Sequence, residues 1–202
     1  MALHSSRVQK EQALAAIAAR IASCEVCTDL CKSCMTPVPG EGDPEAKLMF
    51  VGEAPGAQED REGRPFVGAS GKFLTEMLET IGMTREDVFI TNIVKYRPPE
   101  NRDPTPTEIK ECLPYLMDQI DVIRPRIIIF LGRHSMSVFF PEAKIGQVHG
   151  QAIKSTYVYE GKTYPQIFLP LYHPAAALYN GSMRQTLLED FKQIPDLLRQ
   201  VV

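Results

Sequence analysis

Two groups of residues in this sequence are of types that do chemistry, and the first is a run of cysteines. The chain has five cysteines, and the stretch CEVCTDLCKSC at positions 24–34 holds all of them except Cys112. Disulfides are rare in reducing compartments, where closely spaced thiolates more often bind a metal. Four thiolates can hold either an iron–sulfur cluster or a zinc ion. The spacing therefore predicts a metal centre.

The second group consists of polar and aromatic residues that follow short apolar runs. They are Glu53, Glu59, Phe66, Asn92 and His173. An aromatic face, an amide and a carboxylate can together stack on a planar base and hydrogen-bond its edge. A histidine can hold an anion that develops during a reaction. Each residue alone is also compatible with a structural role, and only their occurrence at successive strand ends favours a nucleobase pocket.

Four apolar runs must position these residues. Each run is short, nearly continuous and rich in β-branched or aromatic residues, as is typical of parallel strands buried on both faces. They are LMFVG (48–52), VFITNIV (88–94), RIIIFLG (126–132) and QIFLPLY (166–172). Helix-like segments separate them, so the pattern predicts a three-layer α/β/α sandwich around a central four-stranded parallel sheet. Ligands of such folds bind beyond the carboxyl ends of the strands.

The remaining segments complete one expected domain over 1–202. Residues 8–22 predict a helix, which opens an N-terminal cluster-binding segment over 8–36. The stretch 152–168 predicts a hairpin that turns at Glu160 and Gly161. Pro195 is expected to interrupt a closing helix over 183–200.

Composition limits the partners that the chain can have. A net charge of −3 gives no support to nucleic-acid binding by the whole surface, so any DNA must be held by local basic patches. Lys95, Arg97 and Arg184 follow the second and fourth strands and are the candidates for phosphate contacts. No apolar run is long enough to span a membrane and the N-terminus lacks an export signal, so we expect a cytoplasmic protein without a membrane partner.

Four longer motifs resemble those of a known family. They are GEAPGAQEDREGRPFVGASG (52–71), TNIVKYRPPENRDPTPTEIKEC (91–112), LGRHSM (131–136) and HPAAAL (173–178). Together they are similar to the motifs of family 4 uracil-DNA glycosylases, the iron–sulfur members of the uracil-DNA glycosylase superfamily. The resemblance runs from about Cys24 to the end of the chain. It implies an enzyme that flips uracil out of DNA and hydrolyses its N-glycosidic bond, leaving an abasic site.

The resemblance also implies a role for each pocket residue. Glu53 and the backbone of Ala54 would line the uracil pocket, Phe66 would stack on the base, and Asn92 would read its polar edge. Glu59 would occupy space near C5 and so reject thymine. His173 would stand near O2 and stabilise the leaving anion, which makes His173 and Glu53 the candidate catalytic residues. Ala54 stands where the best-known branch of the superfamily has an Asp that orients water, so the group that activates water is not identified.

Cysteine positions depart from the family pattern at one point. The family holds a 4Fe-4S cluster with an N-terminal C-x2-C pair, which Cys24 and Cys27 match, a cysteine at the position of Tyr96, and a fourth at Cys112. Because Tyr96 replaces one ligand, we expect the set Cys24, Cys27, Cys34 and Cys112. Cys31 is the substitute for Cys34, and a compact site made of the four N-terminal cysteines is the rival arrangement.

Two other functions stay open. One is a protein of the same fold that binds uracil-containing or damaged DNA without turnover, and the other is an enzyme that also removes further deaminated bases such as hypoxanthine. A DNA-trapping subclass of the superfamily carries an insertion with a histidine after the second strand. The corresponding loop of this chain is short and has no histidine, which favours turnover. Leu178 and Tyr179 offer an apolar wedge for the gap that a flipped base leaves. We expect a monomer, and the sequence identifies no partner protein such as a sliding clamp.

Overall fold

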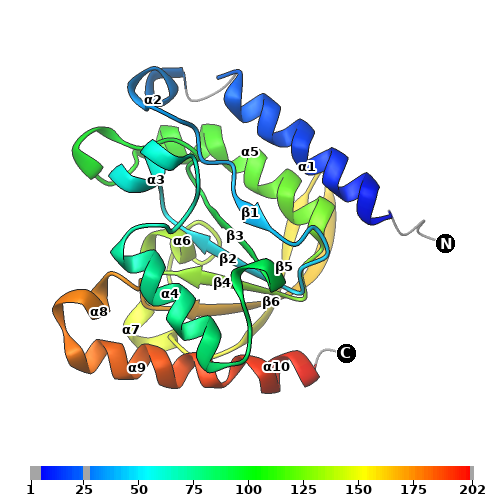
Figure 1. Cartoon of the computed structure of the whole chain (residues 1–202). Helices are drawn as coiled ribbons and strands as arrows, with labels where there is room; N and C mark the ends of the chain where they lie inside the picture. Colours follow the sequence, from blue (N-terminus) through cyan, green and yellow to red (C-terminus); the bar gives the residue numbers. More distant parts are fainter. Residues whose placement is uncertain (1–5, 25–27, 201–202) are drawn as a thin grey trace.

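The computed structural model describes residues 6–24 and 28–200 and has one mixed sheet at its centre (Figure 1). The strand order is β1-β3-β2-β4-β6-β5. The strands are β1 (Glu41–Gly42), β2 (Leu48–Gly52), β3 (Phe89–Asn92), β4 (Ile127–Leu131), β5 (Ile153–Tyr159) and β6 (Lys162–Leu171). Strands β3, β2, β4 and β6 run parallel to one another. At the two edges, β1 pairs antiparallel with β3 and β5 pairs antiparallel with β6. The predicted four-stranded parallel sheet is thus confirmed, with one added strand at each edge.

Helices cover both faces of this sheet, which gives the predicted three layers (Figure 1). The helices are α1 (Arg7–Ala22), α2 (Thr28–Ser33), α3 (Ala57–Glu62), α4 (Ala69–Thr80), α5 (Pro106–Ile123), α6 (Arg133–Ser137), α7 (Ile145–Val148), α8 (Ala176–Tyr179), α9 (Gly181–Lys192) and α10 (Ile194–Gln200), with short 3-10 turns η1 (Arg85–Asp87) and η2 (Pro99–Asn101). Two buried clusters explain the layering. Met49 and Val51 of β2 join the cluster that α1 and α5 cover, and Leu48 and Phe50 join the one under α4 and α9. Alternate residues of one strand therefore seal opposite faces.

Local chemistry sets the element ends that sequence alone indicated. Helix α5 begins with a capping box in which Thr105 and Glu108 satisfy each other's backbone amides, and it ends at Arg124, immediately before Pro125. The hairpin of β5 and β6 turns at Glu160 and Gly161, both with positive φ, as the sequence predicted. The closing helix breaks between α9 and α10, just before Pro195.

Helix α1 is fastened to the rest of the molecule at its carboxyl end. Tyr96 donates a hydrogen bond of 2.7 Å to the carbonyl of Ile21, and Tyr115 donates one of 3.2 Å to the carbonyl of Arg20. The last carbonyls of a helix have no partner within it, so two buried hydroxyls here satisfy them. Among the described residues, no helix is both long and apolar enough to cross a membrane.

Candidate functional site

The ends of β2 and β3 bring the first two candidate side chains together. Parallel pairing places Gly52 beside Asn92, and the amides of Ile93 and Val94 donate to the carbonyls of Gly52 and Glu53, each at 3.0 Å. These bonds continue the ladder one step beyond the strands, so Glu53 and Asn92 leave the sheet at the same edge.

The glycine-rich loop after β2 forms one wall of the site. Glu59 on α3 is buried, and its Oε1 accepts hydrogen bonds of 2.9 Å from the amides of both Val67 and Gly68. The same loop holds Phe66 at φ 51°, a left-handed conformation that a bulky residue rarely adopts. Arg85 adds hydrogen bonds from its guanidinium to the carbonyls of Pro65 and Phe66, at 2.6 and 3.0 Å. Glu59 and Arg85 therefore hold the Phe66 ring in a fixed place.

Gly52 is the position that lets the site close tightly. A Cβ atom at Gly52 would overlap Oδ1 of Asn92 and lie 2.6 Å from Cζ of Phe66. Both contacts are far shorter than a carbon atom tolerates. Only a residue without a side chain allows the amide of Asn92 and the ring of Phe66 to approach the strand end together.

Asn92 carries an acceptor that the described residues leave unpaired. Its side chain is 2% exposed, and Oδ1 has no hydrogen-bond partner. A buried carbonyl oxygen without a partner costs about 1–3 kcal/mol, so such a group usually marks a place where a ligand or water binds. The amide of Asn92 is thus prepared to receive a donor from a molecule in the site.

His173, directly after β6, has a defined protonation state. Burial lowers the pKa of His173 to about 4, so the ring is neutral at ordinary pH. Its Nδ1 accepts a hydrogen bond of 3.1 Å from the amide of Ala175, which leaves the proton on Nε2. The ring also stacks against Phe66, with centroids 5.7 Å apart. His173 therefore presents a fixed, neutral hydrogen-bond donor.

All six predicted pocket residues line one cavity of about 360 Å³. They are Glu53, Ala54, Glu59, Phe66, Asn92 and His173. The same cavity also meets Pro55, Gly56, Ser70, Pro98, Asn101, Arg102, Asp103 and Ala175. A pocket of this size suits a small planar ligand, and its ring, amide, imidazole and carboxylates match the groups that a base requires.

Sequence reasoning missed a histidine beside Glu53. His134 on α6 has its Nδ1 3.9 Å from Oε1 of Glu53 and its Nε2 3.4 Å from Oδ2 of Asp103. Burial raises the pKa of Glu53, while the charge of His134 lowers it and that of Asp103 raises it. The sequence does contain a signal for His134, because the motif LGRHSM stands at the end of the third predicted strand.

The predicted DNA-contacting residues do not all lie on the surface. Lys95 is completely buried, and its ammonium donates to Oγ1 of Thr91, the carbonyl of Asn92 and Oε1 of Gln119, at 2.7, 2.7 and 2.8 Å. Lys95 therefore supports the end of β3 from inside, and its predicted contact with a phosphate is wrong for this structure. The cause is the network of three acceptors, which offsets part of the cost of burying the amine, although burial still lowers the pKa of Lys95 to about 7.

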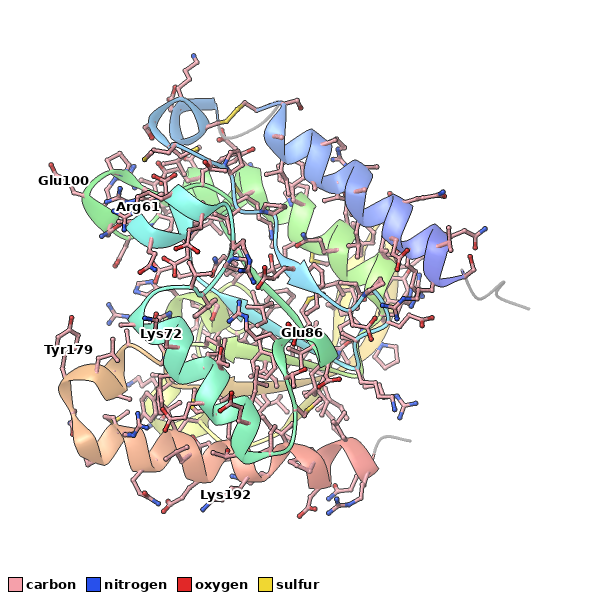
Figure 2. All side chains as sticks on the ribbon, in the orientation of Figure 1. Arg61, Lys72, Glu86, Glu100, Tyr179 and Lys192 are labelled. Carbon is pink, nitrogen blue, oxygen red and sulfur yellow. A yellow bond between two sulfur atoms is a disulfide. The ribbon has the colours of Figure 1, made fainter. Side chains whose placement is uncertain are left out.

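Arg97 and Arg184 remain on the surface. Arg97 donates to Asn101 at 2.8 Å and lies 3.8 Å from Asp60. Arg184 pairs with Glu76 and stacks over the ring of Phe73. Tyr179, the last residue of α8, is 92% exposed and points away from the molecule, while Leu178 is 43% exposed (Figure 2). These two apolar side chains follow His173 by only a few residues and have no packing role of their own.

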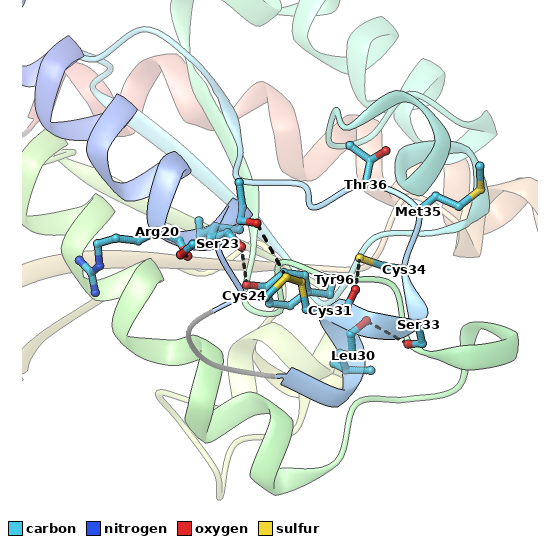
Figure 3. Close-up of a disulfide and its surroundings, with 12 residues drawn as sticks. Arg20, Ser23, Cys24, Leu30, Cys31, Ser33, Cys34, Met35, Thr36 and Tyr96 are labelled. Atoms are coloured by element: carbon cyan, nitrogen blue, oxygen red, sulfur yellow. Dashed lines mark hydrogen bonds between the residues drawn. A yellow bond between two sulfur atoms is a disulfide. The ribbon is translucent and has the colours of Figure 1, made fainter.

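The structure describes three of the N-terminal cysteines, and two of them are bonded to each other. A disulfide joins Cys24 to Cys31, whose Cα atoms are 5.8 Å apart (Figure 3). Cys31 is buried on α2, whereas Cys34 follows that helix, is half-buried and donates to the carbonyl of Cys31 at 3.3 Å. The partner of Cys24 is thus Cys31, which the expected set omitted. Cys27 lies outside the described residues.

Cys112 and Tyr96 complete this region. Cys112 is completely buried on α5, in the cluster that contains Cys31 and Tyr96 and against which Cys24 and Cys34 pack. The distant Cys112 and the N-terminal Cys31 therefore belong to the same buried cluster of side chains. Tyr96, at the position of the missing ligand, uses its hydroxyl to hold α1.

Comparison with known proteins agrees with the site. A model of the uracil DNA glycosylase superfamily matches residues 39–194. The type-4 uracil-DNA glycosylase of Sulfurisphaera tokodaii is 53% identical over 177 residues, which cover 83% of this chain and 80% of that protein. Its counterpart from Saccharolobus solfataricus is 50% identical, covering 90% and 85%, and that from Archaeoglobus fulgidus is 46% identical, covering 90% and 91%. The chain therefore belongs to the uracil DNA glycosylase superfamily.

Proposed function

We propose that this protein removes uracil from DNA by hydrolysing the N-glycosidic bond, leaving an abasic site. The observation that carries the proposal is the unpaired Oδ1 of buried Asn92, which lies in a cavity with the ring of Phe66 and the neutral imidazole of His173. Uracil inside a duplex is out of reach, so the nucleotide must flip out, at a cost of a few kcal/mol.

Asn92 selects uracil over cytosine by the direction of its hydrogen bonds. Its Oδ1 would accept from N3–H of uracil, and its amide NH₂ would donate to O4. Cytosine presents an acceptor at N3 and a donor at N4, so both contacts would be repulsive. Phe66 would stack on the base, and Glu59 with its loop would leave no room for the methyl group of thymine. Leu178 and Tyr179 would fill the gap in the duplex.

His173 stabilises the leaving group in this proposal. As the bond between C1′ and N1 breaks, its electron pair moves into the uracil ring and charge develops at O2, where Nε2–H of His173 donates. The oxygen of a water molecule then bonds to C1′. Among the carboxylates that line the cavity, Glu59 is occupied by two amides and Asp103 is 67% exposed. Glu53 is therefore the carboxylate that would take the proton of this water.

The cysteine region fits a 4Fe-4S cluster by the chemistry of its donors. Cys34 and Cys112 are thiols, and reduction of the bond between Cys24 and Cys31 would supply two more; all four sulfurs belong to or pack against one buried cluster of side chains, and Cys27 lies near them in sequence. We propose Cys24, Cys27 and Cys112 as ligands, with Cys34 as the fourth and Cys31 as its rival because it contacts Cys24. A bound cluster would tie α1 and α2 to α5.

Iron content and colour of single variants test this ligand set without an activity assay. Cys24→Ala, Cys27→Ala, Cys34→Ala and Cys112→Ala are each expected to lose the iron–sulfur absorption, whereas Cys31→Ala keeps it. Loss of colour in Cys31→Ala with retention in Cys34→Ala would make Cys31 the fourth ligand. Retention in Cys112→Ala would contradict the set and favour four N-terminal ligands.

Strand scission after alkali tests the reaction itself. The protein is incubated with oligonucleotides that contain one uracil, thymine, cytosine or hypoxanthine, and the abasic product is cut with alkali. We expect scission at uracil over many turnovers, with thymine and cytosine intact. Retention of DNA without scission would contradict the proposal and indicate a binding protein. Scission at hypoxanthine would extend the range of bases.

A further inference from the structure

His134 stands between the pocket and the loop that borders it, although it does not line the cavity. It belongs to α6, which begins two residues after β4, whereas Glu53 follows β2 and Asp103 follows η2. Ligand atoms of these three side chains lie within 4.8 Å of one another. Three segments far apart in sequence thus bring two carboxylates and one imidazole to a single point.

The two nitrogens of the His134 ring have different surroundings. On the outer side, Nε of Arg133 donates to Nε2 at 3.0 Å, and Asp103 lies 3.4 Å from the same nitrogen. In the neutral ring, Nε2 is therefore the acceptor and Nδ1 carries the proton. Nδ1 faces Oε1 of Glu53 at 3.9 Å. This distance exceeds that of a hydrogen bond, so in this structure the N–H of Nδ1 acts on the Glu53 carboxylate by longer-range electrostatic attraction.

Several charges decide the ionisation of Glu53. Burial raises its pKa, the charges of His134 and Arg133 lower it, and Asp103 raises it. The other charged or titratable groups that line the same cavity are Glu59, Arg102 and His173. A carboxylate that takes a proton from water must be ionised beforehand, so its neighbours matter to its work. The N–H group of His134 that faces Oε1 of Glu53 is one of these neighbours.

We propose that His134 is a positioning residue for Glu53, and that Asp103 couples the loop after η2 to the same imidazole. His134 keeps the carboxylate of Glu53 ionised and turned toward the cavity, where it receives the proton of the water whose oxygen bonds to C1′. This inference rests on the proposed function, because it assigns His134 to that reaction.

Single-turnover excision of uracil as a function of pH tests the proposal. Removal of the Nδ1–H group in His134→Ala is expected to move the acid limb of the rate profile to higher pH and to slow excision at neutral pH by about tenfold or more. Removal of the anion in Asp103→Asn is expected to move the limb to lower pH. Glu86→Gln removes an exposed charge on η1 and serves as the matched control, with the limb unchanged.

If His134→Ala and Asp103→Asn shift the acid limb in opposite directions, the two residues act on the ionisation of Glu53. A residue that only supports the structure would lower the rate at every pH. Asp103 is on the surface, so Asp103→Asn keeps the proposal testable even if His134→Ala unfolds. NMR of the Glu53 carboxyl group in the DNA-free proteins should give titration midpoints in the same order, with His134→Ala above the wild type and Asp103→Asn below it. If the titration midpoint of Glu53 is the same in both variants as in the wild type, the inference is overturned, whether or not the wild type excises uracil. Loss of excision on chelation, restored by Mg²⁺, would also overturn it.

Discussion

His173 and Asn92 show how single residues prepare this site before a ligand arrives. The imidazole is held neutral by burial and oriented by the amide of Ala175, and the amide oxygen of Asn92 is left without a partner. Both groups are arranged at a cost in folding free energy that a bound base would recover. Preorganisation of this kind is what a hydrolase needs when its leaving group is an anion.

The protonation of His173 gives a prediction for pH dependence. Because its folded pKa is lowered to about 4, the ring stays neutral and Nε2 stays protonated throughout the range above about pH 5. We expect NMR of the ring to show a midpoint near 4, and excision to show no loss as pH rises through 6.5, the ordinary value for histidine. A midpoint near 6.5 would mean that an imidazolium acts instead.

The close approach at Gly52 gives a second prediction. Gly52→Ala should displace Asn92 and Phe66, because a Cβ atom would overlap both, and should lower single-turnover excision by about 100-fold or more. Gly181→Ala on α9 is the matched control, since a Cβ atom there meets nothing within 4 Å. Equal excision by the two variants would show that the pocket is less tightly packed than described.

At the scale of elements, the loop between η2 and α5 is held by one ion pair. Arg102, which lines the cavity, makes two hydrogen bonds to Glu108 at 2.8 and 2.6 Å, and Glu108 also caps α5. The bonds from Arg102 are the main cause that lowers the pKa of Glu108 to about 2. The start of α5 and the border of the pocket therefore depend on the same carboxylate.

The variant Glu108→Gln tests the role of the ion pair between Arg102 and Glu108. A carboxylate with a lowered folded pKa stabilises the protein above its unfolded pKa of about 4.3, and this contribution is lost as pH falls toward 2. Gln can still cap α5, so we expect the variant to lose only the contribution of the charge pair with Arg102, about 1 kcal/mol of unfolding free energy at pH 7. In urea titrations, wild type and variant should converge near pH 2. A difference that is the same at both pH values would contradict the assignment.

Elements also mark where sequence reasoning succeeded and where it stopped. Continuous apolar runs predicted the parallel strands, and the end of each strand predicted Glu53, Asn92 and His173 at one edge. The inward turn of Lys95 could not be predicted, because it depends on Gln119 of α5, which folding brings beside the end of β3 to complete a set of three acceptors with Thr91 and Asn92. The place of His134 at the site could be predicted only by knowing that α6 begins two residues after β4 ends. Strand β1, with two residues, is too short for any periodic pattern.

At the scale of the whole molecule, the sheet separates two regions with different tasks. One edge carries the cavity, and the N-terminal elements carry the cysteines, with α5 contributing Cys112 to that region. The net charge of −3 means that DNA must be held by a few surface cations rather than by a broad basic face. Arg97 and Arg184 are the surface members of the predicted set.

The salt dependence of DNA binding tests the part played by Arg184. If its guanidinium contacts one phosphate, Arg184→Ala should reduce the slope of log affinity against log salt by about one for a duplex without uracil. Arg199→Ala on α10, whose side chain is 73% exposed, is the control that should leave the slope unchanged. Identical slopes for all three proteins would remove Arg184 from the DNA interface.

The most direct test of the account is single-turnover release of uracil from an oligonucleotide, with wild type and His173→Ala compared under enzyme excess. We expect the wild type to release uracil from every molecule and to leave an alkali-sensitive site. His173→Ala should bind the same DNA and be slower by about 100-fold or more, because the leaving anion loses its donor. Nearly equal rates for the two proteins, or no release by the wild type, would contradict the account.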